Sequence, residues 1–116
     1  TVYKEGKPLF IDVGVESYTK KTFSPQRYEI WTMQSAYHNL PAINGFMQQD
    51  GEDYRAKNTT CRMDNTLCEI DMDISDAYPK ESRLSFYRRK ACLLKGKEIL
   101  IRNNGSAFRN SVADDL

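Results

Sequence analysis

The sequence consists of short apolar runs that are separated by clusters of Gly, Pro, Asn and Asp, and this punctuation most constrains its fold. No stretch keeps the apolar repeat of about 3.6 residues that an amphipathic helix needs. Alternation with a period of two, bounded by turn-forming residues, is typical of half-buried β-strands. The pattern therefore predicts an all-β fold.

Several regions carry the strand signal. Residues 8–15 form an apolar run that ends at Gly14, and residues 27–39 alternate polar and apolar or aromatic side chains. In residues 84–103, Lys95-Gly96-Lys97 lies between two β-rich runs and predicts a hairpin. The spacing is typical of an antiparallel β-sandwich of about seven to nine short strands. We expect one domain over residues 1–105, followed by a tail or short helix at residues 106–116.

Turn chemistry and side-chain alternation add two finer predictions. The pairs Asn44-Gly45 and Asp50-Gly51 suit the positive φ angles of tight turns, so one or two hairpins are expected there. In the strand that follows Asn65, acidic residues alternate with apolar ones. This alternation predicts that the acids face water. The expected buried face consists of Cys68, Ile70, Met72 and Ile74.

Charge and hydropathy exclude two classes of partner. The 17 basic and 16 acidic residues leave a formal net charge of +1, which provides no global field to attract nucleic acid. No apolar run approaches the roughly 20 residues that span a bilayer. The opening stretch TVYKEGKPLF lacks the charged start and apolar core of a signal peptide. We expect a fragment or processed piece, with neither a nucleic-acid partner nor a membrane segment.

The three cysteines, Cys61, Cys68 and Cys92, do not match a zinc-binding CxxC pair. Their odd number cannot complete a disulfide framework. The interpretation favoured by residue type is that of free, buried thiols acting as small apolar groups. A Cys61–Cys68 or Cys68–Cys92 bridge stays open as an alternative if the protein is exported.

His38 is the only histidine of the chain. Zinc requires a cluster of ligands, and no spacing brings Asp50, Asp53, Asp64 or a cysteine to this histidine, so we expect no metal site. Taken alone, a single histidine is best explained by a structural role. The acidic residues of the segment 69–76 lack the glycine and the terminal glutamate of a calcium loop. They are therefore interpreted as a solvated strand face.

Aromatic residues offer a second type of candidate site, because exposed rings can stack on sugars through their apolar faces. At strand spacing, however, aromatic side chains more often face a core, and we expect this for most of them. The residues in question are Tyr3, Tyr18, Tyr28, Trp31, Tyr54 and Tyr78.

A set of segments also follows a family pattern in order along the chain. GKPLFIDVGVESYT (6–19) contains an apolar strand with Asp-x-Gly and Tyr-Thr, and SAYHNLPAINGFMQ (35–48) contains Ser-x-x-His-Asn before an Asn-Gly turn. EIDMDISDAYP (69–79) contains Asp-x-Ser-x-Ala-Tyr-Pro and precedes the hairpin of residues 87–103. Together these segments resemble the C-terminal β-sheet domain of the heparinase II/III-like polysaccharide lyases.

The resemblance implies a domain of an enzyme that cleaves an acidic polysaccharide, such as heparan sulfate, heparin or an alginate-like glycan, by β-elimination. An N-terminal α/α-toroid of the same enzyme, absent from this chain, would supply most of the cleft. The isolated chain would then be inactive. The resemblance further implies a bacterial periplasmic or secreted enzyme, and we expect no cofactor. A two-histidine zinc site, present in some members, cannot form with a single histidine.

The histidine of the family's Ser-x-x-His-Asn strand corresponds to His38, which the resemblance implies as the catalytic residue. Histidine can serve there as a base or, when protonated, as a stabiliser of negative charge. Asn39 and Tyr37 are expected as local supports, and Arg27 or Arg55 as contacts for a carboxylate or sulfate. The alternative is a non-catalytic carbohydrate-binding or structural sandwich, in which His38 is a packed strand residue.

Overall fold

The computed structural model describes residues 1–109, and its contacts divide the chain into two compact units. The first unit is Thr1–Ala42, and the second begins at Ile43. Both contain antiparallel strands, and residues 1–109 include no α-helix, only short 3₁₀ turns. The predicted all-β antiparallel class is confirmed.

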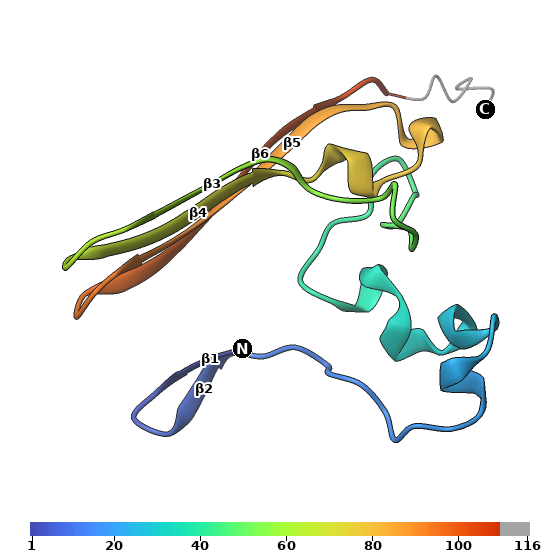
Figure 1. The fold of residues 1–116 in the computed structure, drawn as a ribbon, viewed down its shortest axis with the longest axis horizontal. Helices are drawn as coiled ribbons and strands as arrows, with labels where there is room; N and C mark the ends of the chain where they lie inside the picture. Colours follow the sequence, from blue (N-terminus) through green and yellow to red (C-terminus); the bar gives the residue numbers. More distant parts are fainter. Residues whose placement is uncertain (110–116) are drawn as a thin grey trace, which may run out of the picture. The chain divides into compact units, whose positions relative to one another are not determined.

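The first unit begins with a hairpin of β1 (Val2–Lys4) and β2 (Lys7–Phe10) (Figure 1). Glu5 and Gly6, with φ angles of 51° and 75°, form its turn. The strand predicted over residues 8–15 therefore ends early. Its end has a local cause, because the Asp12 carboxylate accepts the backbone N–H of Gly14, at 2.9 Å, and turns the chain.

The strand predicted over residues 27–39 is wrong. The chain here forms consecutive 3₁₀ turns, in which polar side chains bind nearby backbone groups and compete with strand pairing. For example, the Gln34 side chain donates to the Tyr28 carbonyl at 2.9 Å. The turns of this unit are η1 (Lys21–Phe23), η2 (Arg27–Glu29), η3 (Trp31–Met33) and η4 (Ser35–Tyr37).

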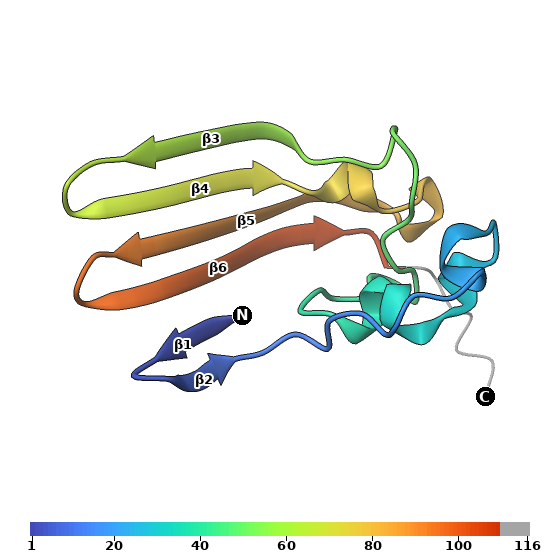
Figure 2. The same cartoon turned by 60° about the horizontal axis from the view of Figure 1, so that its bottom comes forward.

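The second unit is built on a four-stranded antiparallel meander in the order β3-β4-β5-β6, which Figure 2 shows with the strands side by side. The predicted hairpin at Lys95-Gly96-Lys97 joins β5 to β6 and is confirmed. Two 3₁₀ turns connect β4 to β5. The elements are β3 (Lys57–Met63), β4 (Leu67–Asp73), η5 (Ser75–Ala77), η6 (Lys80–Ser82), β5 (Leu84–Leu94) and β6 (Glu98–Ala107).

The described residues contain six strands, fewer than predicted, and β6 continues two residues past the expected domain end at 105. The rest of the predicted tail, from residue 110, lies outside the described residues. The Asn44-Gly45 turn is confirmed, because Ile43 and Phe46 pair across it. Gly51 accepts a turn hydrogen bond from Tyr54, but no strands flank it. No helix in residues 1–109 is long and apolar enough to cross a membrane.

The core of the second unit lies at the end of the sheet where η5 and η6 pack. The buried apolar side chains there are Ile74, Ala77, Tyr78 and Tyr87, whereas Leu67, which is also buried, lies at the opposite end of β4, paired with Leu94. The face predicted to be buried in β4 is only partly so: Ile74 is buried, and Cys68 and Met72 are half-buried. Ile70 is exposed, whereas Asp71 is half-buried and pairs with Arg88 across the strands at 2.9 Å. A basic side chain of β5 thus pairs with an acidic side chain of β4 and partly neutralises this face of the strand.

The cysteines differ from expectation in burial. All three thiols are free in the structure. Cys61 is exposed, and Cys68 and Cys92 are half-buried, so none of them is the fully buried apolar group that residue type favoured.

Candidate active site

His38 directly follows η4 and has an extended backbone, with φ of −105° and ψ of 179°. Its Nδ1 lies 2.7 Å from Asp12 Oδ2, and its Nε2 lies 2.8 Å from the Thr32 carbonyl oxygen. Carboxylate and carbonyl oxygens are acceptors, so both contacts are hydrogen bonds only when both ring nitrogens carry a proton. The site therefore favours an imidazolium ion. All three residues belong to the first unit.

The same contacts set the titration of the pair. The hydrogen bond to Asp12, followed by that to the Thr32 carbonyl, raises the pKa of His38 above its usual value. The hydrogen bond from His38, followed by that from the Gly14 N–H, lowers the pKa of Asp12. The ion pair is partly open to solvent, since 25% of the His38 side chain and 31% of the Asp12 side chain are exposed.

These directions define the pH range in which the pair stabilises the fold. A raised histidine pKa contributes stability below the unfolded value of 6.5, and this is lost as pH rises through the folded pKa. A lowered aspartate pKa contributes stability above the unfolded value of 3.8, and this is lost as pH falls through the folded pKa. The contribution of both groups is therefore complete between pH 3.8 and 6.5.

We expect Asp12→Asn to lower the pKa of His38 towards its ordinary value, because the charged acceptor becomes neutral. A single histidine gives one set of imidazole signals, so an NMR pH titration reads the change directly. Asp64→Asn is the matched control, because the Asp64 carboxylate holds a turn of the second unit, whereas His38 belongs to the first. An unchanged His38 pKa in Asp12→Asn would contradict the ion pair.

The geometry limits what His38 can do chemically. While the imidazolium donates to Asp12 and to the Thr32 carbonyl, neither nitrogen has a lone pair to accept a proton. Loss of the Nε2 proton would leave that lone pair against the Thr32 carbonyl oxygen, which is repulsive. As it stands, the residue fits the role of a fixed imidazolium, whose charge Asp12 partly balances, better than the role of a general base.

Asn39 adds a second link between the same two segments. Its side-chain amide donates to the Ile11 carbonyl at 3.1 Å, next to the contact of His38 with Asp12. The dipeptide His38-Asn39 thus binds the dipeptide Ile11-Asp12, which is 26 to 28 residues earlier in the chain. Asn39 acts here as a positioning residue for the loop that follows β2.

Tyr37 and Arg27 are exposed residues of the first unit. The Tyr37 ring meets Trp31 edge-on, with ring centroids 5.3 Å apart and an interplanar angle of 79°. The guanidinium of Arg27 lies over the Tyr28 ring, 5.4 Å from its centroid. Arg55 is an exposed residue of the second unit and is not part of the His38 cluster.

Sequence reasoning did not identify Asp12 and Thr32 as partners of His38. Asp12 carried a usable signal, since Asp-x-Gly marks a turn that holds its carboxylate at the end of a strand. The Thr32 contact uses a backbone carbonyl, which no residue type reveals. Within residues 1–109 no three His, Cys, Asp or Glu side chains gather as metal ligands.

Comparison with known proteins adds no assignment. A scan against protein-family models and a search of curated proteins gave no match to this chain. The functional interpretation therefore depends on the residues and their geometry.

Proposed function

We propose that this chain is the β-domain of a polysaccharide lyase that cleaves uronate-containing glycans by β-elimination. One observation carries the proposal. Two segments that resemble the lyase family at the level of sequence are joined through the Asp12–His38 ion pair and the Asn39–Ile11 hydrogen bond. The matching residues of these two segments therefore meet in one polar cluster around His38.

β-Elimination requires a positive group close to the uronate carboxylate, and the chemistry of the reaction shows why. A base removes the proton α to the uronate carboxylate, the electron pair forms a carbon–carbon double bond, and the glycosidic oxygen leaves with a proton from an acid. Negative charge grows on the carboxylate during proton removal, and a nearby cation stabilises it. Protonated His38 is the group proposed for this role. The base and acid would come from an N-terminal α/α-toroid of the same enzyme, as the resemblance implies.

The same proposal covers partner and location. The substrate would be an acidic polysaccharide of the heparan sulfate, heparin or alginate type, and the enzyme would be periplasmic or secreted in a bacterium. Exposed Arg27 lies in the same unit as His38 and offers a positive group for a substrate carboxylate or sulfate. Arg55 is proposed for the same chemistry from the second unit.

The complete protein, incubated with heparin, heparan sulfate and alginate in turn, is expected to generate the absorbance of unsaturated uronate with at least one of them. A neutral polysaccharide of similar length is the control, because without a carboxylate the α proton is not acidic enough to be removed. Residues 1–116 alone are expected to give no signal. Absence of unsaturated product from every acidic polysaccharide would count against the lyase assignment.

A non-catalytic carbohydrate-binding module is the second candidate, and two observations favour it. Both ring nitrogens of His38 are occupied by acceptors of the protein itself. In addition, Trp31 and Tyr37 form an exposed aromatic pair of the kind that stacks on sugars. The same assay separates the candidates, because a binding module retains the polysaccharide without producing a double bond.

A further inference from the structure

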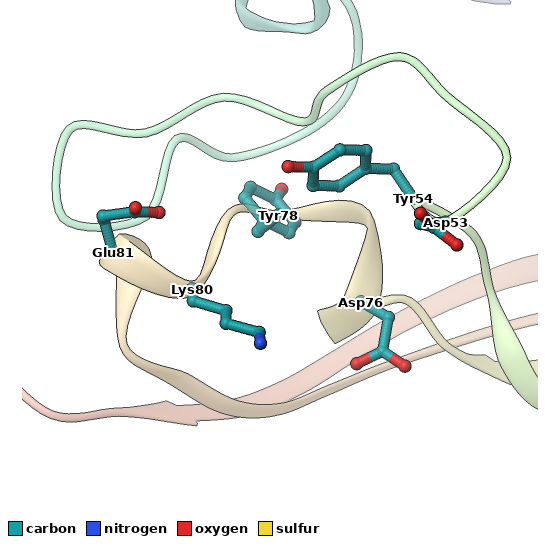
Figure 3. Close-up of a pocket in the computed structure, with 6 residues that line it drawn as sticks. All are labelled: Asp53, Tyr54, Asp76, Tyr78, Lys80 and Glu81. Atoms are coloured by element: carbon teal, nitrogen blue, oxygen red, sulfur yellow. The ribbon is translucent and has the colours of Figure 1, made fainter.

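The second unit contains a hollow of about 540 Å³ that has no part in the His38 cluster. This volume lies within the usual range of small-ligand pockets, about 300–1,000 Å³. Figure 3 shows the side chains that line it, with Asp53 and Glu81 at opposite ends in this view. The lining residues are Asp53, Tyr54, Asp76, Tyr78, Lys80 and Glu81.

The two tyrosines provide apolar surface of different kinds. Tyr78 is only 4% exposed and forms part of the core beneath the hollow. Tyr54 is 38% exposed, so part of its ring is available to a ligand. The ring of Tyr54 lies against Gly51, where a Cβ would contact it at 3.5 Å. An exposed ring held against the backbone is a suitable stacking surface for a flat apolar face.

The segments around the hollow are tied together by hydrogen bonds. The backbone N–H of Gln49 donates to the Ala77 carbonyl at 2.9 Å and joins the loop before Tyr54 to η5. The Lys57 ammonium pairs with Asp76 at 2.8 Å and joins η5 to the start of β3. A ligand entering the hollow would therefore meet a largely pre-formed surface, which lowers the entropy cost of binding.

The polar groups define the chemistry of the ligand. The carboxylates of Asp53, Asp76 and Glu81 accept hydrogen bonds, and the Lys80 ammonium donates them. Hydroxyl groups of a sugar both donate and accept, so they match this mixed set. A uronate or sulfate would face three carboxylates against the single lining ammonium of Lys80, and this excess of negative charge is unfavourable for an anion. The Lys57 ammonium already pairs with Asp76, and Lys80 also lines the hollow, so two cations of the protein partly balance these carboxylates and the hollow has little need of a cationic ligand.

We propose that this hollow binds an uncharged sugar residue, with Tyr54 stacking on the ring and the carboxylates accepting its hydroxyl hydrogens. The site goes beyond the proposed elimination, and it does not depend on it. All six lining residues belong to the second unit, whereas His38 belongs to the first. In an alternating glycan, such a site would select the neutral sugar rather than the acidic one.

Isothermal titration calorimetry of the complete protein tests this site with neutral tetrasaccharides of N-acetylglucosamine, glucose, mannose and galactose. At least one is expected to bind, and Tyr54→Ala is expected to weaken that binding about tenfold or more through loss of stacking area. Tyr3→Ala is the matched control, because Tyr3 is an exposed tyrosine of the first unit and is expected to leave binding unchanged. Circular dichroism checks that both variants fold.

The preference of the hollow for a neutral over an acidic sugar can also be measured. A tetrasaccharide of uronate residues is expected to bind wild-type protein at this site more weakly than the neutral probe. In the double variant Asp53→Asn, Glu81→Gln, this difference is expected to shrink, because two carboxylates become neutral amides.

Several results would overturn the proposal. These are no binding of any neutral tetrasaccharide, equal binding by Tyr54→Ala and wild type, or displacement of the neutral probe by the polyamine spermidine. A failed elimination assay alone would leave the neutral-sugar site untouched, so the two proposals fail separately.

Discussion

His38→Ala in the complete protein is expected to lower the rate of β-elimination by roughly 10²–10³-fold, the usual cost of removing one group that stabilises charge in a transition state. The imidazolium is held by Asp12 and the Thr32 carbonyl, and an alanine side chain offers neither a donor to those acceptors nor a charge. The rate of appearance of unsaturated uronate, at saturating and at low substrate, gives kcat and kcat/KM. A loss in both indicates an interaction made mainly in the transition state.

Two further variants separate the effect of the positive charge of His38 on the rate from the effect of its hydrogen bonds on the fold. His38→Gln keeps a hydrogen-bonding side chain but no positive charge, and it is expected to remain strongly impaired. Asp12→Asn keeps the imidazole but lowers its pKa, so its activity is expected to fall at a lower pH than that of the wild type. Elimination at the wild-type rate by a folded His38→Ala protein would remove this residue from the mechanism.

Asp73→Ala is expected to destabilise the second unit by roughly 2–4 kcal/mol, because it leaves two backbone N–H groups without an acceptor in a buried environment. Asp73 is 7% exposed, and its Oδ1 accepts the N–H groups of Ser75 at 2.9 Å and Tyr87 at 3.3 Å. These bonds hold the end of β4 to η5 and β5. Urea unfolding, followed by circular dichroism and Tyr fluorescence, measures the loss.

Matched variants test the cause of this loss. Asp73→Asn retains an acceptor oxygen and is expected to cost less than Asp73→Ala. Asp76→Ala, only three residues away, removes an exposed ion pair with Lys57 and is expected to cost about 1 kcal/mol or less. Burial opposes the charged form of Asp73, but hydrogen bonds from Ser75 and Tyr87 lower its pKa overall, so this stabilisation is lost as the pH falls through that pKa. Equal losses for Asp73→Ala and Asp76→Ala would contradict this account.

The strand predictions succeeded where local signals and pairing agree. The hairpin around Gly96 combined a turn residue with two β-rich runs, and β5 and β6 pair on either side of it. Residues 27–39 had the same alternation, but their side chains bind backbone groups nearby and the segment forms 3₁₀ turns. Periodicity describes which side chains could share a face, and it does not decide whether a partner strand is present.

The candidate site was predictable to a similar degree. His38 and Asn39 were identified from the sequence, and both make the polar contacts that define the cluster. Asp12 was part of the family pattern, but nothing local connects it to a histidine 26 residues later. The hollow around Tyr54 was also not predictable, because its walls come from the loop at residue 53 and from the turns around η5 and η6.

The sequence by itself determined the all-β class, the turns at Asn44-Gly45 and Lys95-Gly96-Lys97 and the presence of a single imidazole, because these follow from residue type and short-range spacing. Tertiary structure alone decided that both nitrogens of this imidazole face oxygen acceptors, which favours its charged form, that Asp73 is buried while Ile70 is exposed, and that two tyrosines border one hollow. The reason is physical. Charge state, burial and cavities depend on groups that are distant in the chain and are brought together only when it folds.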